Sequence, residues 1–378
     1  MYIQRTAYNE VIKNLFKNKV IIVYGARQVG KTTLINKIKE YADNKYKTAY
    51  FNCDEPDIRQ AFTDKTSTEL KNFIGSNKLI IIDEAQRVKN IGLTLKLLID
   101  NYKDVQIIAT GSSSFELSNK IAEPLTGRKI ELKLYPFSIQ ELSTNLSYIE
   151  LQRSLNDFLI YGMYPDIIVN KNDRKNSLLS LATSYSYKDI LQFEGIRNSA
   201  ILEKLLQLLA LQAGNEVSFN ELAVSLGIDK NTVVKYIDIL EKAFIVFSLT
   251  SFSRNLRNEL KKSKKVYFWD LGIRNALINN FNPLDFRTDK EKGSLFENFI
   301  IVEKIKHNAN NSIYPNYYFW RTQTNKEIDF LQEIDGKINA YEIKYGKDKI
   351  SEPKIFKEAY PNSSFDLINK NNFLNFYK

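Results

Sequence analysis

Three short apolar runs in the first third of the chain have the pattern of buried strands: residues 19–24, 78–82 and 105–110. Runs of this length, without alternation of apolar and polar positions, are typical of a parallel sheet covered on both faces. Residues 33–39 follow the first run with the spacing of an amphipathic helix. A further strand is expected over residues 129–134. The pattern therefore predicts an α/β domain built on a parallel sheet.

The pattern of residues 200–252 predicts three successive helices. Residues 202–212 and 218–226 form the first two, Gly227 marks a turn, and Asp229 is a good N-cap for the third. This order is typical of a winged helix-turn-helix, a motif whose third helix can bind in the major groove of DNA. On the third helix we expect two faces. The exposed face would consist of Lys230, Asn231, Thr232, Lys235 and Tyr236. The inward face would consist of Val233, Val234, Ile237 and Leu240.

The charge balance favours an anionic partner. The chain has 54 Lys and Arg against 44 Asp and Glu, a net charge of +10, although a solvated surface would give the same balance. Basic residues crowd into residues 254–265, where only Glu259 opposes them, and this cluster would flank the wing beside a strand over residues 265–269. We therefore predict DNA contacts by Lys230, Asn231, Thr232, Lys235, Lys261, Lys262, Lys264 and Lys265. The alternative is a protein-binding module.

The loop after the first apolar run has the composition of a phosphate cradle. Residues 25–32 read GARQVGKT, which fits the pattern GxxxxGK(S/T) in the strand–loop–helix context that it requires. Loop N–H groups and the positive end of the helix dipole bind phosphate oxygens. Lys31 would reach the outer phosphates and Thr32 would hold Mg²⁺; a turn with a chance Lys-Thr is the alternative. The predicted nucleotide contacts are Gly25, Ala26, Arg27, Gln28, Val29, Gly30, Lys31, Thr32 and Thr33.

Two acids, Asp83 and Glu84, follow the second apolar run. The end of this strand would deliver Asp83 toward the Mg²⁺, and Glu84 would polarise an attacking water. The same pair could instead cap a helix that begins near Ala85. Two adjacent acids at this place favour hydrolysis of the nucleotide over binding alone.

Hydroxyl groups and one arginine complete this candidate site. The third apolar run ends at Thr110, and Ser112 follows it, so that either hydroxyl would orient the water or sense the γ-phosphate. Arg128 lies in the loop before residues 129–134. It is a candidate arginine finger, acting in its own chain or on a neighbouring subunit of a homo-oligomer.

The C-terminal third carries a second candidate site. Asp329 lies in a short predicted strand, and after a turn the next strand carries Glu342 and Lys344, which share one face because they are two residues apart. Asp329 and Glu342 would ligate Mg²⁺, and Lys344 would position or activate the water. Glu297, on a helix predicted over residues 294–306, adds a metal-binding acid. A solvated hairpin face is the alternative.

Together these motifs resemble a family of bacterial and archaeal ATPases of the AAA+ superfamily. The resemblance rests first on GARQVGKT, LIIIDEAQR, IIATGSSS, LTGR and YPFS, and continues through YGMYP, VYFWDLG, GSLFEN, EIDF and EIK. The chain departs from the family at Tyr161, where a second glycine is usual. The resemblance implies a C-terminal restriction-endonuclease-like domain with the PD-(D/E)xK arrangement at Asp329, Glu342 and Lys344.

The predicted organisation has four parts. They are a P-loop ATPase core over 1–138, a helical lid over 139–199, a winged helix-turn-helix over 200–268 and a restriction-endonuclease-like domain over 269–378. The expected function is ATP binding and hydrolysis with Mg²⁺, action on DNA, and a metal-dependent nuclease in the C-terminal domain. The alternative is a nucleotide-dependent switch or scaffold that binds a protein partner and has an inactive nuclease-like fold.

Composition excludes several other classes of protein. The single cysteine, Cys53, rules out an intrachain disulfide framework and fits a reducing cytosol, and the single histidine, His307, argues against a Ser-His-Asp triad. No apolar run reaches the roughly 18 residues of a membrane helix. The opening residues resemble no signal peptide. We therefore expect a cytoplasmic protein without a membrane partner.

Overall fold

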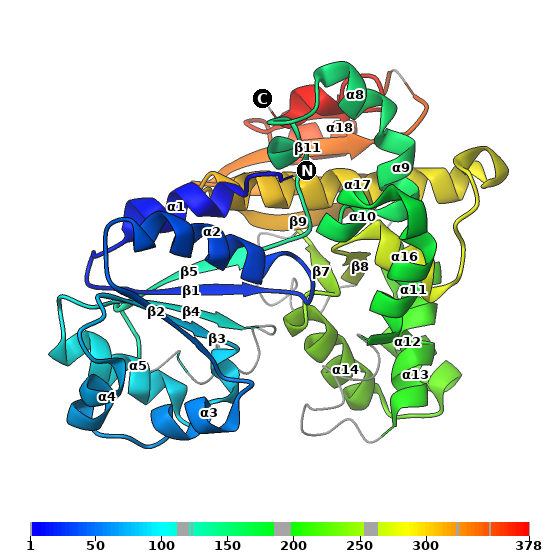
Figure 1. The fold of residues 1–378 in the computed structure, drawn as a ribbon. Helices are drawn as coiled ribbons and strands as arrows, with labels where there is room; N and C mark the ends of the chain where they lie inside the picture. The colour runs from blue at the N-terminus through cyan, green and yellow to red at the C-terminus, as the bar shows by residue number, and fades with distance from the viewer. Residues whose placement is uncertain are drawn as a thin grey trace. The chain divides into compact units, whose positions relative to one another are not determined.

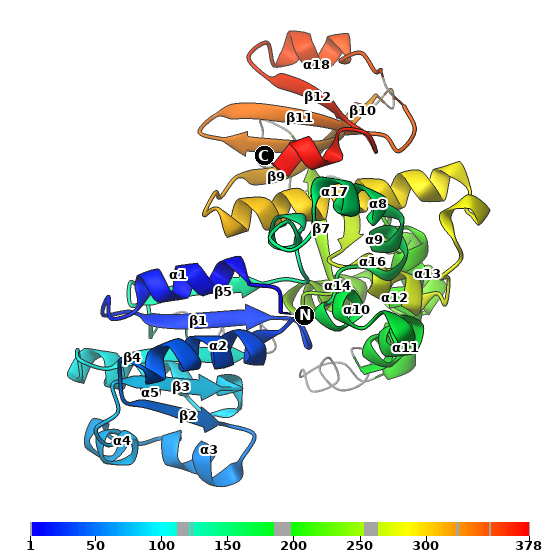
Figure 2. The ribbon, with the colours of Figure 1, turned by 45° about the horizontal axis from the view of Figure 1, so that its top comes forward.

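The computed structural model describes residues 2–111, 121, 124–184, 198–252, 264–322, 324, 326–347 and 349–377. They belong to two compact units, each described by itself. The first unit comprises Tyr2–Tyr135 and Lys242–Phe244, and the second comprises Pro136–Glu241 and Ile245–Lys378. Both are drawn in Figures 1 and 2.

The first unit is built on a five-stranded parallel sheet with the order β2-β3-β4-β1-β5. Its strands are β1 (Val20–Gly25), β2 (Thr48–Asn52), β3 (Leu79–Asp83), β4 (Gln106–Gly111) and β5 (Lys129–Leu134). The central strands β1, β3 and β4 are buried along their whole length, which confirms the interpretation of the three apolar runs. The parallel α/β prediction is confirmed, and β2 is an additional strand that the sequence pattern did not indicate.

Helices cover both faces of this sheet. Figure 1 shows α1 and α2 on one face and α5 on the other. The helices of the first unit are α1 (Thr6–Asn14), α2 (Lys31–Asp43), α3 (Pro56–Phe62), α4 (Ser67–Ile74) and α5 (Ile91–Asn101), with a 3-10 turn at Ala85–Arg87. Helix α2 buries Leu34, Ile35 and Ile38, the apolar stripe expected of its amphipathic sequence.

The second unit contains a seven-stranded mixed sheet with the order β12-β11-β10-β9-β7-β8-β6. Its strands are β6 (Glu216–Val217), β7 (Val246–Ser251), β8 (Lys264–Phe268), β9 (Asn316–Arg321), β10 (Glu327–Ile334), β11 (Lys337–Ile343) and β12 (Ser364–Ile368). Strand β7 pairs in parallel with β9, and β11 with β12; the other pairs are antiparallel. The β7–β9 pair thus joins the strands around residues 246–268 and the C-terminal strands into one sheet.

Many short helices and one long helix surround this sheet. They are α7 (Ile139–Leu142), α8 (Tyr148–Arg153), α9 (Leu155–Tyr161), α10 (Pro165–Val169), α11 (Arg174–Ser184), α12 (Ser199–Leu211), α13 (Phe219–Leu226), α14 (Lys230–Lys242), α16 (Leu271–Leu277), α17 (Asp289–Asn310) and α18 (Lys354–Ala359), with 3-10 turns at Lys171–Asp173, Leu284–Phe286 and Phe373–Tyr377. The long helix α17 packs against β8 and β11. Helices α8 and α9 follow each other directly and are separated only by Ser154.

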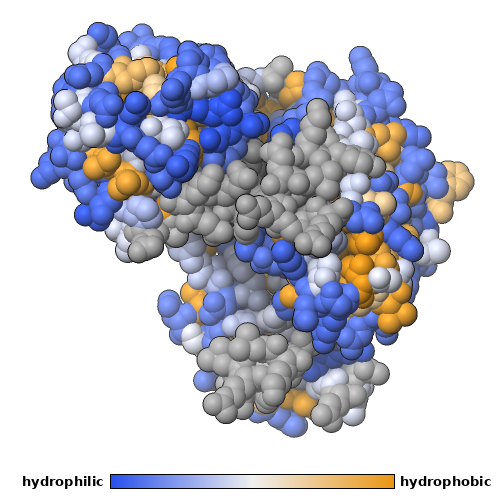
Figure 3. Space-filling view, turned by 90° about the horizontal axis from the view of Figure 1, so that it is seen from below, coloured by the Kyte–Doolittle hydropathy of each residue, from blue (hydrophilic) through white to orange (hydrophobic). Residues whose placement is uncertain are grey.

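Side-chain burial fits these assignments. A cluster of buried apolar side chains lies between the sheet and α18; it includes Phe252, Trp320 and, from α18 itself, Phe356. Figure 3 shows one face of the molecule, on which hydrophilic residues predominate and hydrophobic residues form separate areas. Within the described parts of the chain, no helix combines the length and apolar character needed to cross a bilayer.

Candidate functional site

The loop from β1 to α2 has the backbone shape of a phosphate cradle. Strand β1 ends at Gly25, and α2 begins at Lys31. Between them Gln28 (φ 58°) and Gly30 (φ 93°) take left-handed conformations, which turn successive N–H groups toward the inside of the loop. A Cβ at Gly25 would collide with the carbonyl oxygen of Leu134 on β5, so only glycine fits there.

Lys31 lies directly over this loop. Its Nζ donates to the carbonyl oxygens of Gly25 and Ala26, both at 2.9 Å, and its side chain is buried. Thr32 and Thr33 are exposed in the first turn of α2, where the helix leaves N–H groups without intrahelical partners. The structure thus brings the predicted phosphate-binding residues together at one helix N-terminus.

Asp83, at the end of β3, is a buried carboxylate held by two hydroxyl groups. Tyr50 on β2 donates to Oδ2 at 2.5 Å, and Thr110 on β4 donates to Oδ1. The backbone N–H of Glu84 also donates to Oδ1, at 3.2 Å. Burial raises the pKa of Tyr50, and the hydrogen bond to Asp83 raises it further, so the phenol remains a donor. These bonds fix the orientation of the carboxylate.

One prediction changes at this point, and one residue of the site was not predicted. Thr110 was expected to face the cleft, but its side chain is fully buried and its hydroxyl is committed to Asp83, because it stands beside Asp83 on the neighbouring strand. Its hydroxyl therefore positions the carboxylate of Asp83. Sequence reasoning missed Tyr50 altogether. Ser112, the other predicted hydroxyl, lies outside the described residues.

Glu84 occupies a strained position directly after Asp83. Its φ of 51° lies in the left-handed region, which is uncommon for residues other than glycine and occurs at functional sites. The side-chain amide of Gln86 donates to its carboxylate. This left-handed residue follows the last residue of β3 directly.

The phosphate loop and the two acids share one edge of the sheet. The registers pair Tyr24 with Gly111 and Ile82 with Ala109, so β1, β3 and β4 all end at the same side. In parallel α/β sheets, ligands bind outside the carboxyl ends of the strands. This edge is therefore the candidate nucleotide site.

Arg128 lies at the opposite edge of the same sheet. Its carbonyl oxygen accepts a hydrogen bond from the N–H of Val20, the first residue of β1, whereas the phosphate loop begins at the last residue of that strand. Its Nε pairs with Asp100 at 2.6 Å. A six-residue strand is about 17–20 Å long, more than an arginine side chain spans. Of the two alternatives for Arg128, action on the nucleotide of its own chain does not fit this position, and action on a neighbouring subunit stays a prediction.

The second unit brings the predicted C-terminal site residues together. Lys344 Nζ lies 2.8 Å from Asp329 Oδ2 and 2.9 Å from Glu342 Oε1. The N–H of Ile343 also donates to Asp329 Oδ2, at 2.8 Å. The hairpin turn at Asp335 and Gly336, both with positive φ, sets this register as the sequence predicts.

Lys265 belongs to the same group, which corrects its predicted role as a DNA contact. Only 3% of this residue is exposed, and its Nζ lies 3.2 Å from Glu297 Oε1 and forms an ion pair with Glu327. Tyr267 donates to the same Glu297 oxygen at 2.7 Å. The position of Lys265 on β8 turns its side chain inward, where the ammonium group cannot reach a DNA phosphate. We call Lys265, Glu297, Glu327, Asp329, Glu342 and Lys344 the C-terminal cluster.

Electrostatics in the C-terminal cluster follow from burial and charge pairing. Burial raises the pKa of Glu297 to about 7, although Lys265 acts in the opposite direction. Burial lowers the pKa of Lys265, but Glu297, Glu327 and Asp329 outweigh it and hold the pKa above its ordinary value. Burial also raises the pKa of Glu342, with Asp329 adding to the effect.

This arrangement does not fit the predicted Mg²⁺ site. Asp329 and Glu342 share the ammonium group of Lys344, and Glu297 meets that of Lys265. No group of three or more Asp, Glu, His or Cys among the described residues is arranged to hold a metal ion. The metal-binding role predicted for Asp329, Glu342 and Glu297 is therefore not supported by the geometry.

Helix α14 presents the remaining predicted DNA contacts. Asp229 caps it by accepting from the N–H groups of Asn231 and Thr232, at 2.8 and 3.1 Å. Exposed on it are Lys230, Asn231 and Lys235, whereas Thr232 is half-buried. Lys264, on β8, is also half-buried, with its Nζ over the ring of Phe219; Lys261 and Lys262 lie outside the described residues.

Two positions of α14 have the reverse of their predicted exposure. Tyr236 is 4% exposed and Val234 is 41% exposed. Tyr236 is three residues after Val233 and four before Leu240, so helical geometry places all three on the buried face. Val234 falls outside that stripe and faces solvent.

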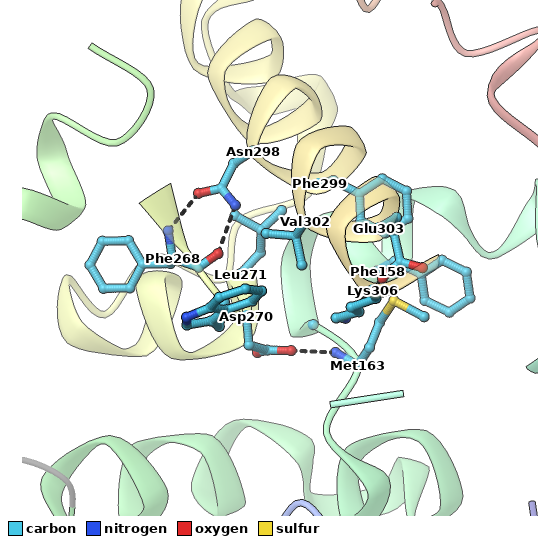
Figure 4. Close-up of a pocket in the computed structure, with 12 residues that line it drawn as sticks. Phe158, Met163, Phe268, Asp270, Leu271, Asn298, Phe299, Val302, Glu303 and Lys306 are labelled. Carbon is cyan, nitrogen blue, oxygen red and sulfur yellow. Dashed lines mark hydrogen bonds and ion pairs between the residues drawn. The ribbon is translucent and has the colours of Figure 1, made fainter. Parts of the chain in front are cut away.

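The pocket drawn in Figure 4 is structural. Asp270 accepts from the N–H of Met163 at 2.7 Å and from that of Ile273 at 3.2 Å, and Asn298 on α17 pairs with both backbone groups of Phe268. The cavity holds about 10 Å³, barely the room a water molecule needs. The residues that line the cavity therefore hold α9, α16 and α17 together. The cavity itself offers no space for a substrate.

Three segments of the chain match known families. Residues 17–143 match a family described as "AAA domain", residues 152–284 a domain of unknown function (DUF8612), and residues 292–374 a domain of unknown function (DUF4143). The first match supports an AAA-type ATPase domain in this part of the chain. The restriction-endonuclease-like fold of the C-terminal part stays a prediction.

Similar proteins exist in distant organisms. An uncharacterized protein of Mycobacterium tuberculosis is 26% identical over 344 residues, covering 90% of this chain and 74% of that protein. One of Methanocaldococcus jannaschii is 25% identical over 380 residues, covering 94% and 82%. The solved structure of a Walker-type ATPase of Pyrococcus abyssi is 16% identical with a TM-score of 0.45, covering 72% of this chain and 94% of that one. A likeness at this level carries no inference about activity.

Proposed function

We propose that the chain binds and hydrolyses ATP in its first unit and that it acts on DNA. The observation that carries the first part is the shared sheet edge. Lys31 lies over the phosphate loop after β1, and at the same edge β3 ends in Asp83, followed directly by Glu84, with β4 between the two strands. Lys31 would bind the outer phosphates. Glu84 would orient the attacking water.

The residues at this edge also fit a nucleotide-bound Mg²⁺. The exposed hydroxyl of Thr32 and the carboxylate of Asp83 are oxygen donors of the kind that Mg²⁺ prefers, and they would hold the ion. When bound, the ion neutralises charge on the phosphates. Tyr50 and Thr110 keep the Asp83 carboxylate in one orientation, which supports its assignment as the residue that faces the ion.

The proposal of DNA binding rests on α14 and its neighbours. The order α12, β6, α13, α14, β7, β8, with β6 paired to β8, supports a winged helix-turn-helix. Helix α14 exposes Lys230, Asn231 and Lys235, and the chain has a net charge of +10. We assign no nuclease step to the C-terminal cluster, because its carboxylates are engaged by lysines. A module that binds a protein partner is the second candidate.

Two substitutions test the ATPase. Lys31→Ala should abolish nucleotide binding or reduce it severely, since the loop loses the ammonium group that lies over it. Glu84→Gln should bind ATP as the parent does and fail to hydrolyse it, since the binding groups survive and water activation is lost. Binding of a fluorescent ATP analogue and release of phosphate measure the two steps. Parental turnover in Glu84→Gln would remove Glu84 from its proposed role.

A charge-matched pair of variants tests DNA binding. Lys230→Ala with Lys235→Ala should weaken binding of duplex DNA and flatten its salt dependence, since each lost phosphate contact removes roughly 0.9 from the log–log slope. Lys354→Ala with Lys357→Ala removes the same charge from exposed positions of α18 and controls for net charge. Equal affinity and slope in both double variants would favour the protein-binding candidate.

A further inference from the structure

The C-terminal cluster contains its own cations. Four carboxylates, from Glu297, Glu327, Asp329 and Glu342, meet two ammonium groups, from Lys265 and Lys344. Lys344 stands at the exit of β11, and 32% of its side chain is exposed. Lys265 lies on a different strand, β8, and only 4% of its side chain is exposed.

The three partners of this ion-pair network come from three different elements. Lys265 lies on β8, Glu297 on α17 and Glu327 on β10. A fully buried lysine is rare and needs charged partners to offset the loss of water. Here Glu297 is 13% and Glu327 29% exposed in their side chains, and the ring of Phe319 lies 5.4 Å from Nζ. The lysine is therefore sealed in a polar pocket of its own unit.

We propose that Lys265 is the fixed cation of the C-terminal cluster, and that its ammonium group occupies the place between Glu297 and Glu327 which a divalent ion would otherwise take. The cluster then holds β8, α17 and β10 together by charge and binds no metal. This inference concerns the second unit alone and does not depend on the proposed ATPase.

The contacts of the two acids show why a metal ion and Lys265 compete. A Mg²⁺ ion needs carboxylate oxygens at about 2.0–2.1 Å, with close to octahedral geometry. Oε1 of Glu297 already accepts from Lys265 at 3.2 Å and from Tyr267 at 2.7 Å. Glu327 pairs with Lys265 and lies 3.9 Å from Arg321. A divalent ion would have to displace these donors and would also be repelled by the buried ammonium group.

The charge of Lys265 also supports the proposal. The neighbouring carboxylates outweigh burial and keep the pKa of Lys265 above its ordinary value, so the side chain stays a cation at neutral pH. The second lysine completes the pattern at the other acids, since Lys344 contacts both Asp329 and Glu342. Each carboxylate of the C-terminal cluster thus has an ammonium partner that the chain itself supplies.

Mn²⁺ binding measured by electron paramagnetic resonance tests the proposal on the full chain without nucleotide. Asp83→Asn is used as the background, so that the first unit lacks the carboxylate proposed to hold its Mg²⁺. This background protein should bind no Mn²⁺ up to millimolar concentration. Adding Lys265→Met should create one site at least about tenfold tighter than any in the background, because the acids lose their cation.

A neighbouring lysine gives the matched control. Lys264→Met makes the same change one residue earlier on β8, at a half-buried position, and should create no site. Adding Glu297→Gln to Lys265→Met should remove the site that the latter creates. Circular dichroism shows whether each variant is folded.

The proposal is overturned by either of two results. One is Mn²⁺ binding to the background protein that Glu297→Gln or Asp329→Asn abolishes. The other is a folded Lys265→Met variant that gains no site. If Lys265→Met does not fold, the background titration still decides, since absence of binding supports the proposal and binding that depends on Glu297 contradicts it.

Discussion

The phenol of Tyr50 donates a 2.5 Å hydrogen bond to Oδ2 of Asp83, across the pair of strands β2 and β3. With Thr110 on the other oxygen, the carboxylate is held from both sides. A carboxylate fixed in this way cannot rotate when a ligand arrives. Tyr50 is therefore a positioning residue for the candidate nucleotide site.

We expect Tyr50→Phe to lower ATP turnover by roughly tenfold and to leave ATP affinity near the parental value. A hydrogen bond to a charged group is worth about 1.5–3 kcal/mol, and about 1.4 kcal/mol corresponds to a factor of ten. Phosphate release and binding of a fluorescent ATP analogue measure the two quantities. Tyr46→Phe, at a tyrosine before β2 that is 36% exposed, is the control. Parental turnover in Tyr50→Phe would show that Asp83 needs no such support.

The parts of this fold that the sequence predicts are those with local signals. Buried strands appear as apolar runs, and the phosphate loop appears as a glycine pattern between a strand and a helix. Tyr50 has neither signal, because β2 is half-buried along its length and gives no uniform run. Its contact with Asp83 depends on the placement of β2 beside β3, which only the strand order of the folded sheet determines.

Lys265 illustrates the other limit. In the sequence it is one of several neighbouring basic residues, and a charge count assigns all of them to a surface. Its partners Glu297 and Glu327 lie far along the chain, on α17 and β10, and meet it only when β8 joins the sheet. The predicted exposure of Val234 and Tyr236 is wrong for a simpler reason. The buried stripe of α14 includes Tyr236 and leaves out Val234.

The position of Arg128 gives a prediction about assembly. Since this residue lies at the sheet edge opposite the phosphate loop, it can act only on the nucleotide of another subunit. We expect Arg128→Ala to bind ATP normally, and a mixture of Arg128→Ala with Lys31→Ala to hydrolyse more ATP than either variant alone. In the mixture, an intact Arg128 meets an intact phosphate loop. If the mixture shows only the sum of the two separate rates, Arg128 has no role as an arginine finger.

Two glycine substitutions test how closely Gly162, directly after α9, packs against Asp270, directly before α16. Gly162 has a φ of 70°, and a Cβ there would collide with the carboxylate of Asp270, whereas a Cβ at Gly293 in α17 would meet no atom within 4 Å. We expect Gly162→Ala to destabilise the protein by at least about 2 kcal/mol. Gly293→Ala should instead stabilise it by about 0.5–1 kcal/mol, as alanine does in a helix. Urea unfolding followed by tryptophan fluorescence reports on this unit, because Trp269 and Trp320 both belong to it. Equal stability of the two variants would contradict the proposed collision.

The buried carboxylate of Asp270 gives a prediction about pH. Burial raises the pKa of Asp270, so the folded protein holds this proton to a higher pH than the unfolded chain does. The folded state therefore binds more protons between the ordinary value near 4 and the raised value, and the free energy of unfolding must fall as the pH rises through that window. Asp270→Asn removes the titrating group, although it loses one of the two acceptors used by Met163 and Ile273. We expect the difference in unfolding free energy between parent and variant to move in favour of Asp270→Asn as the pH is raised from 4 to 8.

Urea unfolding at closely spaced pH values, followed by the same tryptophan fluorescence, measures this difference. Asp289→Asn removes a fully exposed carboxyl group at the start of α17 and controls for the change in net charge. Below the window the variant should be less stable than the parent by about 1–3 kcal/mol, because one buried N–H group has lost its acceptor. That deficit should then shrink as the pH rises, since the parent alone has to bury a charge. A deficit that stays constant or grows with pH would mean that the hydrogen bonds from Met163 and Ile273 outweigh the cost of burying Asp270.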